Sequence, residues 1–164
     1  MSLAFSISQR LMSMDDTAWR RHANPWSVYS RMTLLPLFAL AVWSRVWIGW
    51  WSLAAIACVI AWTWLNPRLF QLPRHEDGWA AKAVQGERIW LEGPPEAVVA
   101  RHERAVVVLG SATVIGTIVL GWGLVALDLS ATLLGGIIAM GAKLWLVDRM
   151  TFVHDAMASK HERA

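Results

Sequence analysis

The hydrophobic positions of this chain fall into four long stretches that form two pairs. The stretches cover residues 25–43, 47–65, 106–127 and 131–147. Each is about 17–22 residues long, the length that a helix rising about 1.5 Å per residue needs to cross roughly 30 Å of hydrocarbon. The pattern therefore predicts one all-α domain over residues 1–164, an integral membrane four-helix bundle built from two helical hairpins.

The two pairs are separated by a more polar segment, residues 66–105. Within it, residues 77–91 have the pattern of a short helix that is too short and too polar to cross a bilayer. A helix of this kind lies in the membrane interface with its apolar face toward the lipid. We therefore expect a short cytoplasmic interfacial helix between the two hairpins.

Prolines and capping residues mark the predicted helix boundaries. Asn24 before Pro25 is typical of an N-cap followed by a first-turn proline. Pro67 predicts that the second stretch ends at residue 65, and Pro36 predicts a kink inside the first stretch. The predicted hairpin turns are residues 44–46 and 128–130, with Ser130 as the cap of the last helix.

Small residues recur every four positions in the third and fourth stretches. The two series are Thr113, Thr117 and Gly121, and Ala131, Gly135 and Ala139. Small side chains at this spacing allow close approach of helix backbones in lipid. The pattern predicts that these two faces pack on each other within the second hairpin, although a contact across a dimer uses the same residues.

Composition agrees with a membrane protein. The chain has 56% apolar and 16% charged residues, a mean hydropathy of +0.41 and a net charge of only +3. Basic residues are spread over the polar segments, so a nucleic-acid surface is not expected. Between the paired stretches, residues 44–46 carry only Arg45 and residues 128–130 carry no basic residue. The positive-inside rule then predicts that both termini and the segment 66–105 are cytoplasmic.

The chain is tryptophan-rich, with 12 tryptophans. Most of them, such as Trp47, Trp50 and Trp51, fall near the ends of the predicted membrane helices. Amphipathic indole rings favour the headgroup region of a bilayer. The tryptophans therefore indicate interfacial belts, and a ligand platform is not needed to explain them.

Polar residues gather near the predicted cytoplasmic ends of the four stretches. The candidates for a polar cluster or an anion-binding site are His22, Asn24, Arg31, Asn66, Arg68, Glu87, Arg88, Lys143, Asp148 and Arg149. Ionisable groups near membrane depth tend to pair with each other or to serve a site. Arg31, Asp148 and Arg149 are expected within mutual reach, with Glu87 or Arg88 from the central helix. A structural network and a ligand site both remain open.

Metal and cofactor chemistry have little support in the sequence. No two histidines have close ligand spacing, and the single Cys58 lies within an apolar stretch. No metal site and no cofactor are therefore predicted.

Four short motifs carry a resemblance. They are HANPWS (22–27), LNPRLF (65–70), GERIWL (86–91) and KLWLVDRM (143–150). As a set they resemble a family of small, uncharacterised prokaryotic multi-pass membrane proteins, catalogued as a domain of unknown function. The resemblance implies a four-span protein of a prokaryotic cytoplasmic membrane with its motifs on one membrane side, and it carries no established activity.

Two classes of function follow. Small size and the lack of a nucleophile–base pair favour a non-enzymatic scaffold or accessory subunit that binds a membrane-protein partner, or a second copy of itself, at its cytoplasmic face. The alternative is a small membrane enzyme or carrier that acts on an anionic, lipid-like substrate at the inner leaflet.

Overall fold

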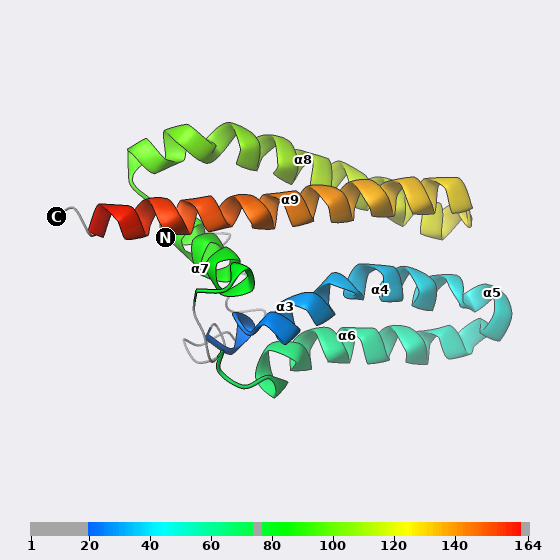
Figure 1. Ribbon diagram of the computed structural model, residues 1–164. Helices are drawn as coiled ribbons and strands as arrows, with labels where there is room; N and C mark the ends of the chain where they lie inside the picture. Colours follow the sequence, from blue (N-terminus) through cyan, green and yellow to red (C-terminus); the bar gives the residue numbers. More distant parts are fainter. Residues whose placement is uncertain (1–19, 74–76, 162–164) are drawn as a thin grey trace.

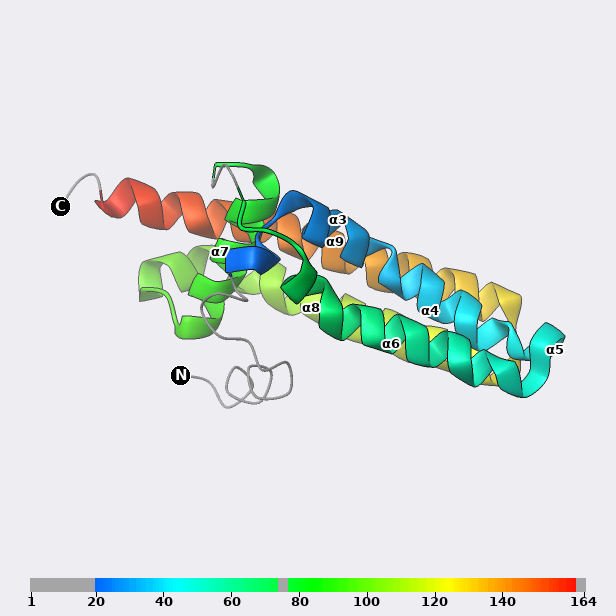
Figure 2. The ribbon, with the colours of Figure 1, turned by 90° about the horizontal axis from the view of Figure 1, so that it is seen from below.

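All regular structure in the described part of the chain is helical. The computed structural model describes residues 20–73 and 77–161, and within these ranges there is no strand. The helices form two hairpins that lie along one long axis, with a shorter helix across one end (Figures 1 and 2). The all-helical class predicted from the hydrophobic pattern is therefore confirmed.

The first hairpin joins several short helices to one longer helix. Its elements are α3 (Pro25–Met32), α4 (Leu34–Trp43), α5 (Arg45–Ile48), the 3-10 turn η1 (Gly49–Trp51) and α6 (Ser52–Leu69). The chain reverses direction at α5, so that α6 runs back beside α4 and α3 (Figure 1). The side chain of Asn24 accepts a hydrogen bond of 2.9 Å from the backbone N–H of Trp26, which confirms the predicted N-cap.

Proline and glycine explain the interruptions of this hairpin. The break between α3 and α4 falls at Thr33, three residues before Pro36, because proline removes one backbone donor and crowds the preceding turn. The turn is longer than the predicted residues 44–46, because Gly49 adopts a left-handed φ of +55° and the next long helix begins only at Ser52.

The prediction that the helix of the second stretch ends at residue 65, before Pro67, is wrong. Helix α6 continues through Pro67 to Leu69. The side-chain amide of Asn66 is fully buried, accepting from the hydroxyl of Ser27 and donating to that of Ser30, each at 2.7 Å. These contacts with α3 hold the last turn of α6, so the cost of one proline is offset by tertiary hydrogen bonds.

The second hairpin consists of two helices longer than the apolar stretches that predicted them. Helix α8 (Glu96–Ala126) and helix α9 (Leu129–His161) extend beyond the stretches at the end where their charged residues lie. Between them Leu127 takes a left-handed φ of 56°. The N-cap is Asp128 and not Ser130, because its carboxylate accepts from the N–H of Ala131 at 2.9 Å.

Close backbone contact joins α8 and α9. A Cβ atom added at Gly135 would lie 2.7 Å from Leu120 Cα, and one added at Gly116 would lie 2.9 Å from Ala139 Cα. The predicted small-residue face of α9 is therefore confirmed at Gly135 and Ala139. The predicted α8 face is wrong, because a Cβ at Gly121 would meet nothing within 4 Å.

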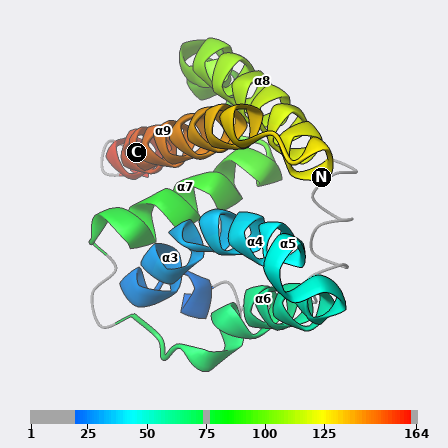
Figure 3. The ribbon, with the colours of Figure 1, turned by 90° about the vertical axis from the view of Figure 1, so that its right-hand side faces the viewer.

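Helix α7 (Trp79–Glu92) packs between the two hairpins at one end of the molecule (Figure 3). One side of α7 forms a small core in which Ala80 and Val84 join Val28 of α3. Another side meets α9, where a Cβ at Gly86 would lie 2.6 Å from the carbonyl carbon of Met150. The predicted short helix thus exists, with both hairpins as its packing partners.

Helices in the described residues are long and apolar enough to cross a membrane. They fall in the segments Pro25–Asn66, Glu96–Ala126 and Leu129–Ser159, and the first of these contains the first hairpin except for the last turn of α6. Large apolar side chains on their outer faces are exposed, among them Ile118 and Val114. An apolar exterior on long helices is the pattern of an integral membrane protein.

Candidate functional site

The ten candidate residues come from segments that meet at one end of the molecule. The segment before α3, the end of α6, helix α7 and the C-terminal half of α9 all lie at the end opposite α5 (Figure 1). Within this end the structure distributes the ten residues over several different interactions. Four of them share one cavity, and the other six make contacts elsewhere.

The shared cavity has a volume of about 450 Å³. Its ionisable lining residues are His22, Arg31, Glu87 and Lys143. The remaining lining is almost entirely apolar and comes from α3, α4, α7, α8 and α9; it includes Val28, Met32, Leu35, Val84, Met140, Leu144 and Val147. A mostly apolar cavity of a few hundred Å³ with a few converging polar groups is the usual form of a small-molecule site.

Arg31 and His22 form the most enclosed polar pair of this cavity. The Arg31 guanidinium contacts the His22 ring and donates to the carbonyl oxygens of His22 at 3.1 Å and of Ser27 at 3.0 Å. Burial, together with the charges of Arg31 and Lys143, lowers the pKa of His22 to about 2. The imidazole is therefore neutral at physiological pH, and the Arg31 charge beside it is fixed.

Lys143 and Glu87 form the second polar pair. Lys143 Nζ lies 2.8 Å from Glu87 Oε1, which links α9 to α7. Both side chains are partly exposed, at 46% and 33%, and such pairs contribute little net stability and rearrange easily. The cavity thus holds two cations and one carboxylate, so a monoanion would neutralise it.

Asn24 and Asn66 act in the architecture of the first hairpin. Asn24 caps α3, and its side-chain N–H donates to the carbonyl oxygen of Gln71 at 2.9 Å. Asn66 is bound by Ser27 and Ser30. Both residues therefore join α3 to the end of α6, and neither lines the cavity.

The remaining candidates lie outside the cavity. Arg68 stacks on the Trp64 ring, with its guanidinium carbon 3.9 Å from the ring centroid. Arg88 pairs with Glu92 on the same helix at 2.8 Å. The guanidinium carbon of Arg149 lies 5.4 Å from the Phe152 ring centroid. These contacts fit a structural role at the polar end of the bundle.

Asp148 has a partner that the sequence analysis did not foresee. Trp79 Nε1 of α7 donates to Asp148 Oδ1 of α9 at 2.8 Å, and the described residues give Asp148 no ion pair. The expected pairing of Asp148 with Arg31 or Arg149 is therefore replaced by a neutral donor. A partly buried indole N–H usually has a hydrogen-bond acceptor, so Trp79 was the feature of the sequence that could have pointed to this contact.

A second ion pair between α7 and α9 was also missed. Lys82 Nζ lies 2.9 Å from Asp155 Oδ1, two helical turns beyond Asp148. It resembles the Lys143–Glu87 pair in length and in joining the same two helices, and it does not line the cavity. Within the described ranges, no group of three histidine, cysteine, aspartate or glutamate side chains lies together as a metal site.

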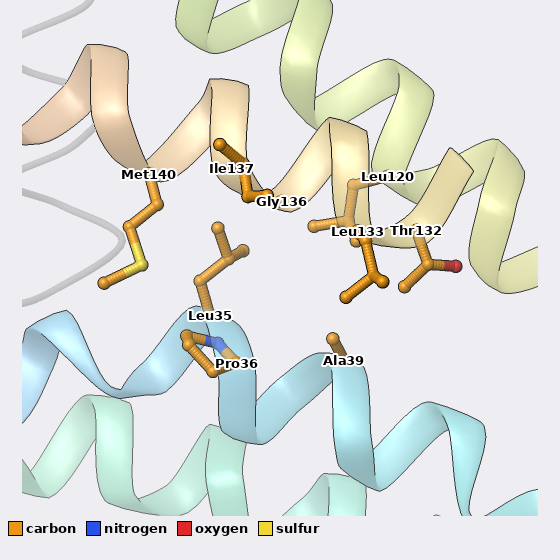
Figure 4. Close-up of a pocket in the computed structure, with 9 residues that line it drawn as sticks. All are labelled: Leu35, Pro36, Ala39, Leu120, Thr132, Leu133, Gly136, Ile137 and Met140. Atoms are coloured by element: carbon orange, nitrogen blue, oxygen red, sulfur yellow. The ribbon is translucent and has the colours of Figure 1, made fainter. Parts of the chain in front are cut away.

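A further cavity of about 290 Å³ lies between α4 and α9 and is lined by apolar groups and one threonine. Leu35 of α4, Leu120 of α8 and Leu133 of α9 point into this space (Figure 4). Leu35 and Met140 line both cavities, so the two are neighbours along α9.

The fold and the site define an all-helical protein with helices able to cross a membrane and a mainly apolar cavity with one charged end. A family model, described as a family of unknown function (DUF6653), matches residues 6–164. The chain belongs to this family, in agreement with the resemblance seen in its motifs. No curated protein and no solved structure matches the chain.

Proposed function

We propose that the chain crosses a prokaryotic cytoplasmic membrane four times, as two hairpins with both termini and α7 on the cytoplasmic side. The proposal rests on charge. The end that carries α7 holds the cavity cations together with Lys82, Arg88 and Arg149, whereas the opposite end holds Arg45. Basic residues of short segments are retained in the cytoplasm. The motif resemblance to prokaryotic membrane proteins supports the choice of membrane.

A pair of reporter fusions tests this topology. A reporter that is active only in the periplasm should be inactive when fused after Ala164 and active when inserted after Gly49 in the first hairpin turn. The opposite result at both positions would reverse the orientation. Activity at both positions would mean that the first hairpin does not return across the membrane.

We infer further that the protein binds an anionic, lipid-like molecule in the cavity between the hairpins. The observation that carries this function is one cavity with Arg31 and Lys143 at its polar end and apolar side chains elsewhere. A cation attracts an anionic headgroup, while the apolar lining holds hydrocarbon, and both terms favour an amphiphile over a soluble anion.

The charge balance of the cavity supports a monoanion. The neutral His22 ring adds no charge, and Glu87 balances one of the two cations. The proposal covers binding or transfer of the lipid without any chemical step. Each hydroxyl of the lining, on Thr113 and Thr117, donates to a backbone carbonyl oxygen of its own helix and not to a general base.

The test is lipid analysis of purified protein with a matched pair of variants. Lys143→Gln and Lys82→Gln each remove a lysine that pairs with a carboxylate between α7 and α9, and only Lys143 lines the cavity. Native mass spectrometry in mild detergent should detect one retained anionic lipid in wild type and in Lys82→Gln. We expect Lys143→Gln to reduce that retention at least tenfold.

Equal retention in both variants, or retention of zwitterionic lipid in proportion to the membrane, would refute the lipid site. A stoichiometric protein partner in place of a lipid would instead support the scaffold or accessory subunit predicted from the sequence. Melting temperatures of both variants should be recorded, because each loses one ion pair of the same kind and a similar small loss of stability is expected.

A further inference from the structure

The two neighbouring cavities differ in chemistry but share part of their walls. Arg31 and Lys143 line the larger one, whereas Pro36, Ala39, Gly136 and Ile137 line the smaller one. Leu35 and Met140 belong to both. The larger cavity, with its charged residues, therefore adjoins the smaller, apolar cavity at these two side chains. The smaller cavity lies between α4 and α9 (Figure 4).

The distance along α9 from the lysine to the far end of the smaller cavity matches one leaflet. Lys143 lines the larger cavity and Thr132 lines the smaller one, and at about 1.5 Å per residue they are about 16 Å apart. The hydrocarbon core of a bilayer is roughly 30 Å thick, so one leaflet is about 15 Å deep. A hydrocarbon chain whose headgroup lies beside Lys143 would thus end near Thr132.

The volume of the smaller, apolar cavity fits a single hydrocarbon chain. A methylene group takes up about the volume of a water molecule, roughly 30 Å³. The cavity of about 290 Å³ therefore holds about ten methylenes, which is most of one acyl chain. Its lining offers only Thr132 as a polar side chain, and the hydroxyl of Thr132 already donates to the Asp128 carbonyl oxygen at 2.7 Å.

We propose that one hydrocarbon chain of an anionic lipid occupies this smaller cavity while its headgroup is held at Arg31 and Lys143. The inference rests on the proposed lipid site and adds the position, number and length of the chain. A second chain, where the lipid has one, remains in the surrounding bilayer. Affinity should therefore rise with chain length until the end near Thr132 is filled.

Gly136 provides a selective way to block the smaller cavity. A Cβ at Gly136 meets nothing within 4 Å, and the residue lies on the wall of the smaller cavity, so a leucine there fills the cavity without displacing a helix. Gly141 is the matched control on α9, because a Cβ there also meets nothing within 4 Å and the residue lines neither cavity.

The experiment uses a photoreactive probe, a single-chain alkyl methyl phosphodiester of about sixteen carbons with a diazirine at the chain end, because a phosphodiester is a monoanion. The full chain in nanodiscs of zwitterionic lipid is labelled and digested. In wild type and Gly141→Leu, the label should fall on peptides that contain Pro36–Ala39 or Thr132–Ile137. Gly136→Leu should lower this labelling at least fivefold, while probe retention measured by native mass spectrometry falls less.

The outcomes separate the two proposals. In one outcome, Lys143→Gln abolishes probe retention, but the label is found only at lipid-facing residues or near Val147. This result would overturn the chain position and leave the lipid site intact. Retention that is unchanged in Lys143→Gln would overturn both proposals. A chain-length series from eight to sixteen carbons that shows equal retention throughout would also refute the inference.

Discussion

Replacing Gly135 by alanine tests the close packing of α8 on α9. A Cβ at this position would lie 2.7 Å from Leu120 Cα and 2.8 Å from the carbonyl oxygen of Gly116, and it would also meet the backbone nitrogen of Leu120. All three neighbours are backbone atoms. No side-chain rotation relieves the clash, so the two helices must move apart.

The expected cost follows from two opposing effects. Overpacking a tight contact costs typically 1–3 kcal/mol, and a clash with backbone belongs at about 3 kcal/mol. Alanine gains about 1 kcal/mol over glycine in helix propensity. The difference leaves a loss of about 2 kcal/mol. For a chain of this size, 1 kcal/mol corresponds to about 2–4 °C, so the melting temperature should fall by about 4–8 °C.

The neighbouring residue supplies the control. Gly136→Ala makes the same chemical change one position further along α9, where a Cβ meets nothing within 4 Å. It should keep or slightly raise the melting temperature through the same propensity gain. Circular dichroism at 222 nm, recorded for both variants in one detergent, measures the difference. Identical melting curves for the two variants would refute the assigned face of α9.

Three other predictions concern polar contacts, each measured by thermal melting against wild type. The lowered pKa keeps His22 neutral in the folded protein, whereas in the unfolded chain His22 has its ordinary pKa of 6.5 and takes up a proton at lower pH. The free energy of unfolding should therefore fall as the pH drops from 7 to 5, by up to about 1.4 kcal/mol per pH unit. His22→Gln should flatten that slope, and an unchanged slope would contradict the burial of the ring. Trp79→Phe removes the donor to Asp148 and should cost about 1–3 kcal/mol of stability. The double variant with Asp148→Asn should lose less stability than the sum of the two single variants, and losses that add would contradict the contact. Arg45→Gln removes the 2.5 Å hydrogen bond to the Leu124 carbonyl oxygen at the end of α8 and should cost about 1 kcal/mol, whereas an unchanged midpoint would mean that water replaces it.

Local sequence rules located the helices well where capping and composition act alone. The apolar stretches, the Asn24 cap and the break associated with Pro36 depend on neighbouring residues only. The rules failed at Pro67, because the helix there is held by two hydrogen bonds of the Asn66 side chain, which accepts from Ser27 and donates to Ser30. These partners lie 39 and 36 positions earlier in the chain. Such a contact has no local signature in a single sequence.

Helix faces were harder to predict than helix positions. Four-residue spacing identified Gly135 and Ala139 as contact residues but selected Gly121 in place of Gly116 on the opposing helix. Small residues are frequent on every face of a membrane helix, so spacing alone does not show which face meets a neighbour. The partner helix and its register decide this.

The candidate site shows the same division. The candidates chosen by residue type come from segments at one end of the molecule, but residue type did not show which of them contact each other. The larger cavity depends on how α3, α4, α7, α8 and α9 pack around it, and the hydrogen bond of Asp148 depends on the position of the Trp79 indole in α7. Both are properties of how the hairpins pack, and the hydrophobic pattern constrains that packing only weakly.

Helix α9 gives each of its faces a different neighbour. Gly135 packs against α8, Gly136 and Met140 line the cavities, and Met150 receives α7. The first hairpin meets the second through few direct contacts near the cavities. A bound lipid would touch both hairpins there, and a ligand that binds only the folded form stabilises it in proportion to RT ln(1 + [L]/Kd). Delipidated protein should therefore melt at a lower temperature than protein with its lipid, and Gly136→Leu, which fills part of the same space with protein atoms, should narrow that difference.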